Sequence, residues 1–489
     1  MKEQIRDNIS LSAEENLEYI EELLKDNSDI IFRKFNIGKW KASIVYIDGM
    51  ADKILLNEYV LEPLMITYSS INDVTKPQDI RDNLLTVTDM REVKKLSEGV
   101  NAALSGDTLM FIDGLNIAYV IATRYWPVRG VSEPSGETVI RGARDGFTET
   151  IRFNTALVRR RIRDTRFKEE RGVVGKRSKT DIAIMYIDDI VNKDILKEVK
   201  DRIDNINIDA VLDSAYVEQL IEDNKMSLFP QLQTTERPDV VASALYEGRV
   251  AILVDNSPFA IIAPATLPAF FQTPDDYNQR WINSSLVRIL RFVGIVISLI
   301  LPALYVAVTS YHTSIIPTKL AYSIAASREG VPFPAFIEAI IMEFSFAMLM
   351  EAVVRLPKPI GATIGIVGGL IIGQAAVSAG IVSPIMIMIV SWTAITTFVT
   401  PNYEVVSALR MVRFLLIIAS AIIGLYGIIL GLTVLIIHLV KLESFGVPYL
   451  SPIVNPNTRD FKDMFIRAPI SKFKDRPRFM GTGDKIRNE

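Results

Sequence analysis

The feature that most constrains the fold is a run of forty consecutive residues, 360–399, without a single charged side chain. A helix rises about 1.5 Å per residue, so about 20 residues cross the roughly 30 Å hydrocarbon core of a bilayer. The run therefore predicts two membrane helices that meet near Ser378-Ala379-Gly380. Buried helices of a large soluble protein are the weaker alternative. Two further apolar runs are residues 292–310, preceded by Arg288 and Arg291, and residues 414–440, which contain no Asp, Glu, Lys or Arg and one histidine, His438.

A fifth apolar segment, residues 334–354, is interrupted by Glu338, Glu343 and Glu351. Charged groups at bilayer depth are costly and are usually placed against protein or water. The segment is therefore either a span that faces the interior of a helix bundle or an amphipathic helix in the membrane interface. At about 100° per residue the three acids do not form one stripe, which weakens the interface interpretation.

Basic residues predict the orientation of this polytopic domain. Arg280, Arg288 and Arg291 precede the first span, and the tail after Lys441 is again rich in Arg and Lys. Positive residues concentrate on the cytoplasmic side, so both ends are expected in the cytoplasm. That needs an even number of crossings, and 334–354 is our choice for the one segment of five that does not cross.

Glycines recur at every fourth position in the uncharged run, which places them on one helical face. Such a face lets another backbone approach closely. It predicts either ordinary packing within the chain or a self-association seam or narrow pore wall. The seam residues are Gly361, Gly365, Gly369 and Gly373, and the polar residues chosen as candidates for contact with ions are Glu343, Thr363 and Gln374.

The composition excludes several classes of function. The chain has no cysteine and two histidines, so disulfides and thiolate chemistry are excluded and His-rich metal sites are disfavoured. A net charge of -3 argues against general polyanion binding, and no phosphate loop, dinucleotide turn or zinc spacing occurs. The N-terminus lacks the apolar core of a secretory signal, so the first region is expected in the cytosol. We expect no enzyme, no cofactor, no metal and no nucleic-acid partner.

The region before the first span contains an internal repeat. SIVYID (43–48) is echoed by AIMYID (183–188), GDTLMFIDG (106–114) by GRVAILVDN (248–256), and NTALVR (154–159) by NSSLVR (283–288). Each half is predicted to be a strand ending in Asp, then a helix, then a second strand, which gives two similar α/β subdomains. The expected fold class is this α/β cytosolic region followed by an all-α polytopic membrane domain with four to five hydrophobic segments. The expected parts are a charged helix or flexible arm (1–38), two α/β subdomains (39–165 and 166–285), the transmembrane domain (286–442) and a basic cytoplasmic tail (443–489).

Two polar features of the repeat region have competing interpretations. Aspartates at strand ends suggest metal or phosphate chemistry, but such residues more often form turns or cap helices. The basic run between the halves suggests contact with anionic lipid or with another subunit, against a plain solvated helix face. The residues predicted for this contact are Arg159, Arg160, Arg161 and Arg163.

Several long runs resemble one family in order along nearly the whole chain. They are RGARDGF (141–147), NTALVRRRIR (154–163), SKTD (178–181), TERPDVV (235–241), YEGRVAILVD (246–255), REGVPFPAF (328–336) and SFGVPYLSP (444–452). The sequence resembles the A subunit of the GerA-type spore germination receptors. The related stage V sporulation protein AF shares the arginine-rich and SKTD runs, but TERPDVV and the segment around 331–336 place the chain nearer the receptor subunits.

The resemblance implies a multi-pass protein of the spore inner membrane. It implies a transporter-like B subunit and a lipoprotein C subunit as partners, and a homo-oligomer whose membrane segments form a nutrient-gated ion channel that triggers germination. The alternative is a non-conducting scaffold that assembles germination proteins and relays the signal, including a role like that of stage V sporulation protein AF.

Overall fold

The structure, a computed structural model, describes residues 5–66, 77, 89–125, 133–134, 136–454 and 460–488. The chain divides into two compact units, each described separately below. The α/β unit comprises residues 1–223, 232–264 and 474–489, and the helical unit comprises residues 224–231 and 265–473.

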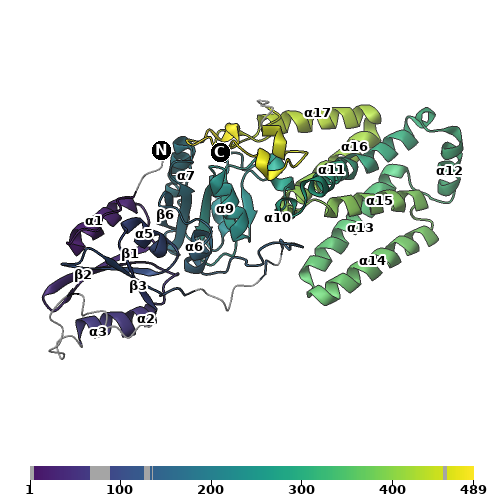
Figure 1. Cartoon of the computed structure of the whole chain (residues 1–489). Coiled ribbons are helices and arrows are strands. Elements are labelled where there is room, and N and C mark those ends of the chain that lie inside the picture. The colour runs from purple at the N-terminus through teal and green to yellow at the C-terminus, as the bar shows by residue number, and fades with distance from the viewer. Residues whose placement is uncertain are drawn as a thin grey trace. The chain divides into compact units, whose positions relative to one another are not determined.

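The first half of the α/β unit is an antiparallel sheet of order β1-β2-β4-β5-β3 with both faces covered (Figure 1). Successive residues of β4 serve opposite cores: Leu109 and Phe111 pack with α1 and α5, whereas Met110 and Ile112 pack with η1 and α3. Burial on both faces explains why the four residues of β4 after Thr108 are all apolar. The elements are α1 (Ala13–Leu23), β1 (Ile30–Ile37), β2 (Trp40–Ile47), α2 (Lys53–Leu55), η1 (Leu56–Leu61), α3 (Glu62–Met65), β3 (Met90–Val93), α5 (Leu96–Leu104), β4 (Thr108–Ile112) and β5 (Ala118–Ile121).

The second half repeats this arrangement. Its antiparallel sheet has the order β6-β7-β9-β10-β8, which matches the first sheet strand for strand. The duplication predicted from the sequence is therefore confirmed. The elements are α6 (Ile151–Arg159), β6 (Phe167–Val174), β7 (Thr180–Ile187), α7 (Lys193–Asp204), α8 (Ser214–Ile221), β8 (Gln233–Thr235), α9 (Pro238–Tyr246), β9 (Val250–Val254) and β10 (Ala260–Ala263).

Hydrogen bonds show the role of the aspartates at the ends of β4 and β9. Asp113 Oδ1 accepts the backbone N–H of Ala13 at 2.7 Å, and Asp255 Oδ1 accepts that of Ile151 at 3.0 Å. Each carboxylate thus satisfies a free donor in the first turn of α1 or α6. The helix-capping interpretation of these two residues is confirmed.

The third sequence echo is wrong as a structural repeat. Asn154 is buried in α6, and its amide and the backbone of Thr148 exchange hydrogen bonds of 2.6 and 2.8 Å. Its counterpart is Asn16 of α1, which exchanges the same pair of bonds with Ser10. Asn283 instead lies exposed on α11 and bonds Gln279. The echo misled because α6 opens the second repeat, whereas α11 follows it.

The N-terminal and C-terminal segments are more structured than the sequence suggested. Residues 1–38, expected as a charged helix or arm, include β1 and the buried α1 residues Leu17 and Ile20. Part of the expected tail forms β11 (Glu443–Ser444), β12 (Val447–Pro448), η5 (Asp460–Asp463), η6 (Ile470–Lys472) and η7 (Arg478–Met480). The domain bounds drawn from the sequence stay predictions.

The helical unit holds the apolar segments. The expected break is confirmed, because α14 ends at Ser378, Gly380 adopts a φ of 66°, and α15 begins at Pro384. Residues 414–440 are not one segment, because Gly424 (φ 62°, ψ -137°) ends α16 and the chain folds back as α17. The helices are α10 (Pro274–Asn278), α11 (Trp281–Ser310), α12 (Thr318–Arg328), α13 (Ala335–Arg355), α14 (Lys358–Ser378), α15 (Pro384–Phe398), α16 (Tyr403–Ile423) and α17 (Leu425–Lys441), with η3 (Leu267–Phe271) and η4 (Thr313–Ile315).

Within the described residues, α11 and α16 are long and apolar enough to cross a membrane, and α15 and α17 are shorter apolar helices. The expected count of four to five spans is thus not confirmed. Much of the apolar surface of these helices points outward, as expected for a helix surrounded by lipid or by another protein. Examples on α11, α16 and α17 are Leu290, Val296, Leu415, Ile422, Leu430 and Val434.

Candidate functional site

A buried ion pair occupies the interior of the helical unit. Glu343 on α13 is 1% exposed, and its Oε2 accepts a hydrogen bond of 3.0 Å from Arg413 Nη1 on α16. Arg413 Nη2 also donates to Thr397 Oγ1 of α15 at 2.9 Å. Three helices therefore meet around one neutralised carboxylate, and Glu343 faces protein rather than an open path.

A second buried carboxylate lies on the same helix. Glu338 is fully buried, accepts from Arg328 Nε at 3.2 Å, and accepts the backbone N–H of Ser383 at 2.8 Å. It ties the end of α12 to the start of α15. Two of the three acids of α13, Glu338 and Glu343, face the interior of the helical unit, whereas Glu351 is exposed and pairs with Arg355. The two buried acids agree with the first of the two interpretations weighed for residues 334–354.

The glycine face of α14 is used at least partly for packing within the chain. Figure 1 shows α13 and α14 side by side, and a Cβ at Gly365 would lie 3.5 Å from Val353 Cγ2 of α13. A Cβ at Gly369 would lie 3.9 Å from Leu349 Cδ2, and one at Gly373 would lie 3.7 Å from Ile387 Cγ2 of α15.

The predicted ion-contact residues differ in their exposure to solvent. Gln374 is exposed, whereas Glu343 is buried. The side chain of Thr363 and the surroundings of Gly361 lie outside the described residues.

An ion cluster that the sequence analysis missed surrounds the start of α11. Arg288 and Arg291 are buried, and both donate to Asp276 Oδ2 of α10, at 3.2 and 3.1 Å. Arg288 Nη1 also donates to Asp463 Oδ1 at 2.8 Å and to its carbonyl oxygen at 2.7 Å. Two arginines thus face two aspartates, so Arg288 and Arg291, whose charge predicts the orientation of the first span, are neutralised in the folded chain.

The segment that brings Asp463, residues 460–467, closes over α10 and α11, and we call it the clamp. Tyr277 donates to Asp463 Oδ2 at 2.6 Å, and Phe465 packs on Phe292 of α11 with ring centroids 4.7 Å apart. Arg467 N donates to Ser285 Oγ at 3.2 Å. The start of α11 is therefore fixed on several sides before the helix enters its apolar part.

The arginine-rich run of the α/β unit does not act as one surface. Arg159 is 1% exposed, donates to Asp29 Oδ1 at 2.8 Å, and lies 4.5 Å from the centre of the Phe167 ring. Its side chain is out of reach of lipid or of another subunit. Arg160 and Arg163 are exposed, and the half-buried Arg161 pairs with Asp145 at 2.6 Å.

The pKa values in this region follow from burial and from these pairs. Burial would raise the pKa of Asp145, but the hydrogen bond and charge of Arg161 lower it below its usual range. Burial, together with the charge of Asp29, raises the pKa of Glu169 to about 7. Arg159 pairs with Asp29, and its charge opposes the rise in the pKa of Glu169.

The model of the family described as Bacillus/Clostridium GerA spore germination protein matches residues 18–479. The chain belongs to the GerA family. The sequence resemblance is thereby confirmed across almost the whole chain.

Relatives of this GerA-family chain span its length. Spore germination protein GerLA of Bacillus cereus is 43% identical over 91% of this chain and 90% of its own length. The uncharacterized membrane protein YfkQ of Bacillus subtilis (strain 168) is 43% identical over 96% of this chain and 91% of its own length. Stage V sporulation protein AF of the same strain is 33% identical over 94% of this chain and 92% of its own length, which agrees with the expected order of similarity.

Among solved structures, the N-terminal domain of the A subunit of the Bacillus megaterium spore germinant receptor GerK3 is similar. It is 35% identical, covers 54% of this GerA-family chain and 99% of that chain, and has a TM-score of 0.43. The three relatives named above are called germination, sporulation or membrane proteins, and none of these three names is that of an enzyme.

Proposed function

We propose that the chain is a subunit of a nutrient germinant receptor in the spore inner membrane, where copies assemble into a germinant-gated ion channel. The observation that carries the receptor role is the continuous family match over residues 18–479. The partners proposed from the resemblance are a transporter-like B subunit and a lipoprotein C subunit. No enzymatic role is proposed.

The membrane placement is supported by where the helical unit puts its apolar and charged groups. Large apolar side chains point outward on α11, α16 and α17, whereas Glu338, Glu343 and Arg413 point inward. This is the distribution that a protein surrounded by hydrocarbon requires. We place the α/β unit and the C-terminal segment in the cytoplasm.

The clamp supports a route for the signal. The chain runs from β10 through η3 and α10 into α11, and the clamp binds α10 and α11 together through Asp276 and Asp463. Because the clamp makes α10 and α11 move together, a displacement of the second sheet would pull on α11 through η3 and α10. A partner that binds nutrient would bias this displacement by binding one arrangement better than the other.

In the proposed channel, Glu343, Thr363 and Gln374 remain the candidate ion contacts, and Gly361, Gly365, Gly369 and Gly373 the candidate seam. Glu343 is neutralised by Arg413 here, which suits a closed state, and opening would separate the pair. Gly369 is exposed in the single chain, so part of the glycine face is open to a second copy.

The test is potassium efflux from liposomes that contain the purified full-length chain with its B and C subunits. We expect efflux after addition of nutrient, and no efflux from liposomes without the chain. Absence of efflux with every nutrient, while the complex is intact by mass, would overturn the channel.

The second candidate is a non-conducting scaffold, and the intrachain packing of the glycine face favours it. The variant Gly369→Gln discriminates between the channel and the scaffold. Gly330→Gln is the control, because a Cβ at Gly330 meets nothing within 4 Å. A leak of ions without nutrient at position 369 supports the channel. Loss of complex assembly without any leak supports the scaffold.

A further inference from the structure

A loop between α8 and β8 of the second repeat belongs to the helical unit. Residues 224–231 separate α8 from β8 in the sequence, yet they pack with the C-terminal end of α17. Phe229 is 3% exposed and its ring lies 6.3 Å from the ring of His438, and Ser227 Oγ lies 3.1 Å from His438 Nε2. We call these residues the α17 loop.

The α17 loop is held in one conformation at both ends. Gln231 closes it, since its Oε1 accepts the N–H of Asn224 and its Nε2 donates to the carbonyl of Asn224, both at 2.8 Å. Ser444 Oγ donates to the carbonyl of Gln231 at 2.6 Å. The exposure of the side chains at its tip is therefore imposed by a fixed backbone.

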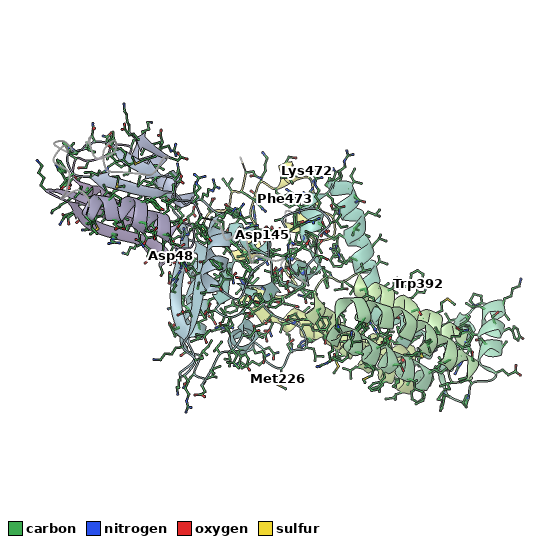
Figure 2. All side chains as sticks on the ribbon, turned by 90° about the horizontal axis from the view of Figure 1, so that it is seen from below. Asp48, Asp145, Met226, Trp392, Lys472 and Phe473 are labelled. Atoms are coloured by element: carbon green, nitrogen blue, oxygen red, sulfur yellow. The ribbon has the colours of Figure 1, made fainter. Side chains whose placement is uncertain are left out.

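The tip presents apolar side chains outward beside a lysine. Met226 is 91% exposed and projects away from the ribbon in Figure 2, and Leu228 is 47% exposed. Lys225, next to Met226, is exposed as well. Single exposed apolar residues are ordinary on soluble surfaces, so their exposure alone does not indicate a binding site. The position of the tip relative to α17 is the informative observation.

That position is the charged end of an apolar helix. His438 is in the last turn of α17, three residues before Lys441, the last residue of the helix. Three residues correspond to about 4.5 Å along a helix, so the loop lies about one turn inward from the terminal lysine. The outward residues of α17 nearby, Val434, Ile437 and Val440, continue the apolar surface toward this level.

We propose that Met226 and Leu228 insert into the boundary between headgroups and acyl chains, with Lys225 and Lys441 near anionic lipid phosphates. Lysines at this level extend toward the headgroups while apolar neighbours stay in the acyl region. The α17 loop would then anchor a part of the chain that precedes the first span to the membrane. This inference rests on the proposed membrane placement of the helical unit, but not on a channel.

The absence of cysteine from the chain allows a direct test. Single-cysteine variants Met226→Cys and Leu228→Cys of the full-length chain are labelled with an environment-sensitive fluorophore and reconstituted in phosphatidylcholine and phosphatidylglycerol vesicles. Val434→Cys, 67% exposed on α17, is the lipid control, and Ile140→Cys, 83% exposed in the α/β unit, is the aqueous control. Quenching by spin-labelled lipid is compared with quenching by aqueous iodide.

We expect blue-shifted emission at positions 226 and 228, with quenching by lipid above quenching by iodide, and the reverse at position 140. If iodide quenches position 226 more than lipid does, as at position 140, while lipid still quenches position 434, the insertion of the tip is overturned. The membrane placement of α17 then still stands. Iodide quenching at position 434 as well would overturn the membrane placement of α17. Protection of position 226 from both quenchers would assign the tip to a protein partner and also overturn the proposal.

Discussion

At the scale of single residues, the buried pair of Arg159 and Asp29 carries the strongest consequence for stability. Arg159→Ala leaves a buried carboxylate without its cation, so the free energy of unfolding of the α/β unit should fall by about 3–5 kcal/mol. Arg163 lies on the same run but is exposed, and Arg163→Ala should change the value by less than about 0.5 kcal/mol. Urea unfolding of the full-length chain in detergent, followed by circular dichroism, measures both. Equal effects of the two substitutions would contradict the buried role.

Glu169 makes the stability of the α/β unit depend on pH. Its pKa is about 7 in the folded protein and 4.5 for an ordinary Glu. Between these values the folded state keeps a proton that the unfolded state has lost, so this stabilising contribution is complete below pH 4.5 and is lost as pH rises through about 7. Asp29, Arg159 and Arg171 are the charged groups that act on it.

Glu169→Gln stays neutral and should remove this dependence. We expect the melting temperature of the variant, minus that of the native chain, to increase as pH rises from about 5 to about 8. Glu58→Gln, at an exposed position of η1, is the matched control. A melting difference that does not change with pH at position 169 would show that Glu169 does not titrate in this range.

The sequence predicted side-chain roles best where they depend on neighbours along the chain. Asp113 and Asp255 follow apolar strands, and such aspartates commonly serve turns and helix starts. Arg413 could not be paired with Glu343 in advance, because 70 residues separate them and only the packing of α13 against α16 brings them together. The same holds for Arg288 and Asp463.

At the scale of elements, the turn at Gly424 decides how the last apolar residues fold. Its φ of 62° and ψ of -137° are almost restricted to glycine, and a Cβ there would lie 2.9 Å from His312 Nε2 and 3.0 Å from Tyr311 Cβ. Gly424→Ala should therefore destabilise the α16–α17 hairpin by about 1–3 kcal/mol. Proteolysis near residue 424 in detergent should accelerate accordingly. Gly330→Ala, with open space around it, should leave the cleavage rate unchanged.

This turn also explains an error of the sequence-based prediction. The hydropathy of residues 414–440 is high throughout. The reversal of the backbone at one glycine does not interrupt this run, so hydropathy alone does not reveal the turn. The break near Ser378 was predictable, because Gly380 is followed by Pro384, which favours a new helix start. The two sheets were predictable from the repeat, and a helix was one of the two alternatives for residues 1–38. The strand β1 and the burial of α1 were missed, because the charged residues there resemble a solvated segment.

At the scale of the whole molecule, the C-terminal residues fold as part of the α/β unit. Arg476 Nε donates to the carbonyl of Tyr246 at 2.9 Å, Gly483 N donates to that of Ile190 at 3.1 Å, and Met480 is fully buried. A chain truncated after Phe473 keeps the clamp but loses these contacts. Its α/β unit should be less stable by roughly 2–4 kcal/mol.

Hydrogen exchange of the full-length and truncated chains in detergent locates this loss. Faster exchange is expected in peptides around Ile190 and Tyr246, while peptides of α11 stay as protected as before. Faster exchange of α11 in the truncated chain would contradict the assignment of the final residues to the α/β unit alone.

The order of synthesis gives the clamp a further consequence. Asp463 is translated 175 residues after Arg288, so the first apolar helix leaves the ribosome without the partner that later helps to neutralise its arginine. In the proposed membrane placement, basic charge beside α11 would set the orientation of this helix during insertion, which is the stage at which Arg288 lacks Asp463. We therefore expect the same arginine to direct insertion first and to receive its final partner only when synthesis is nearly finished.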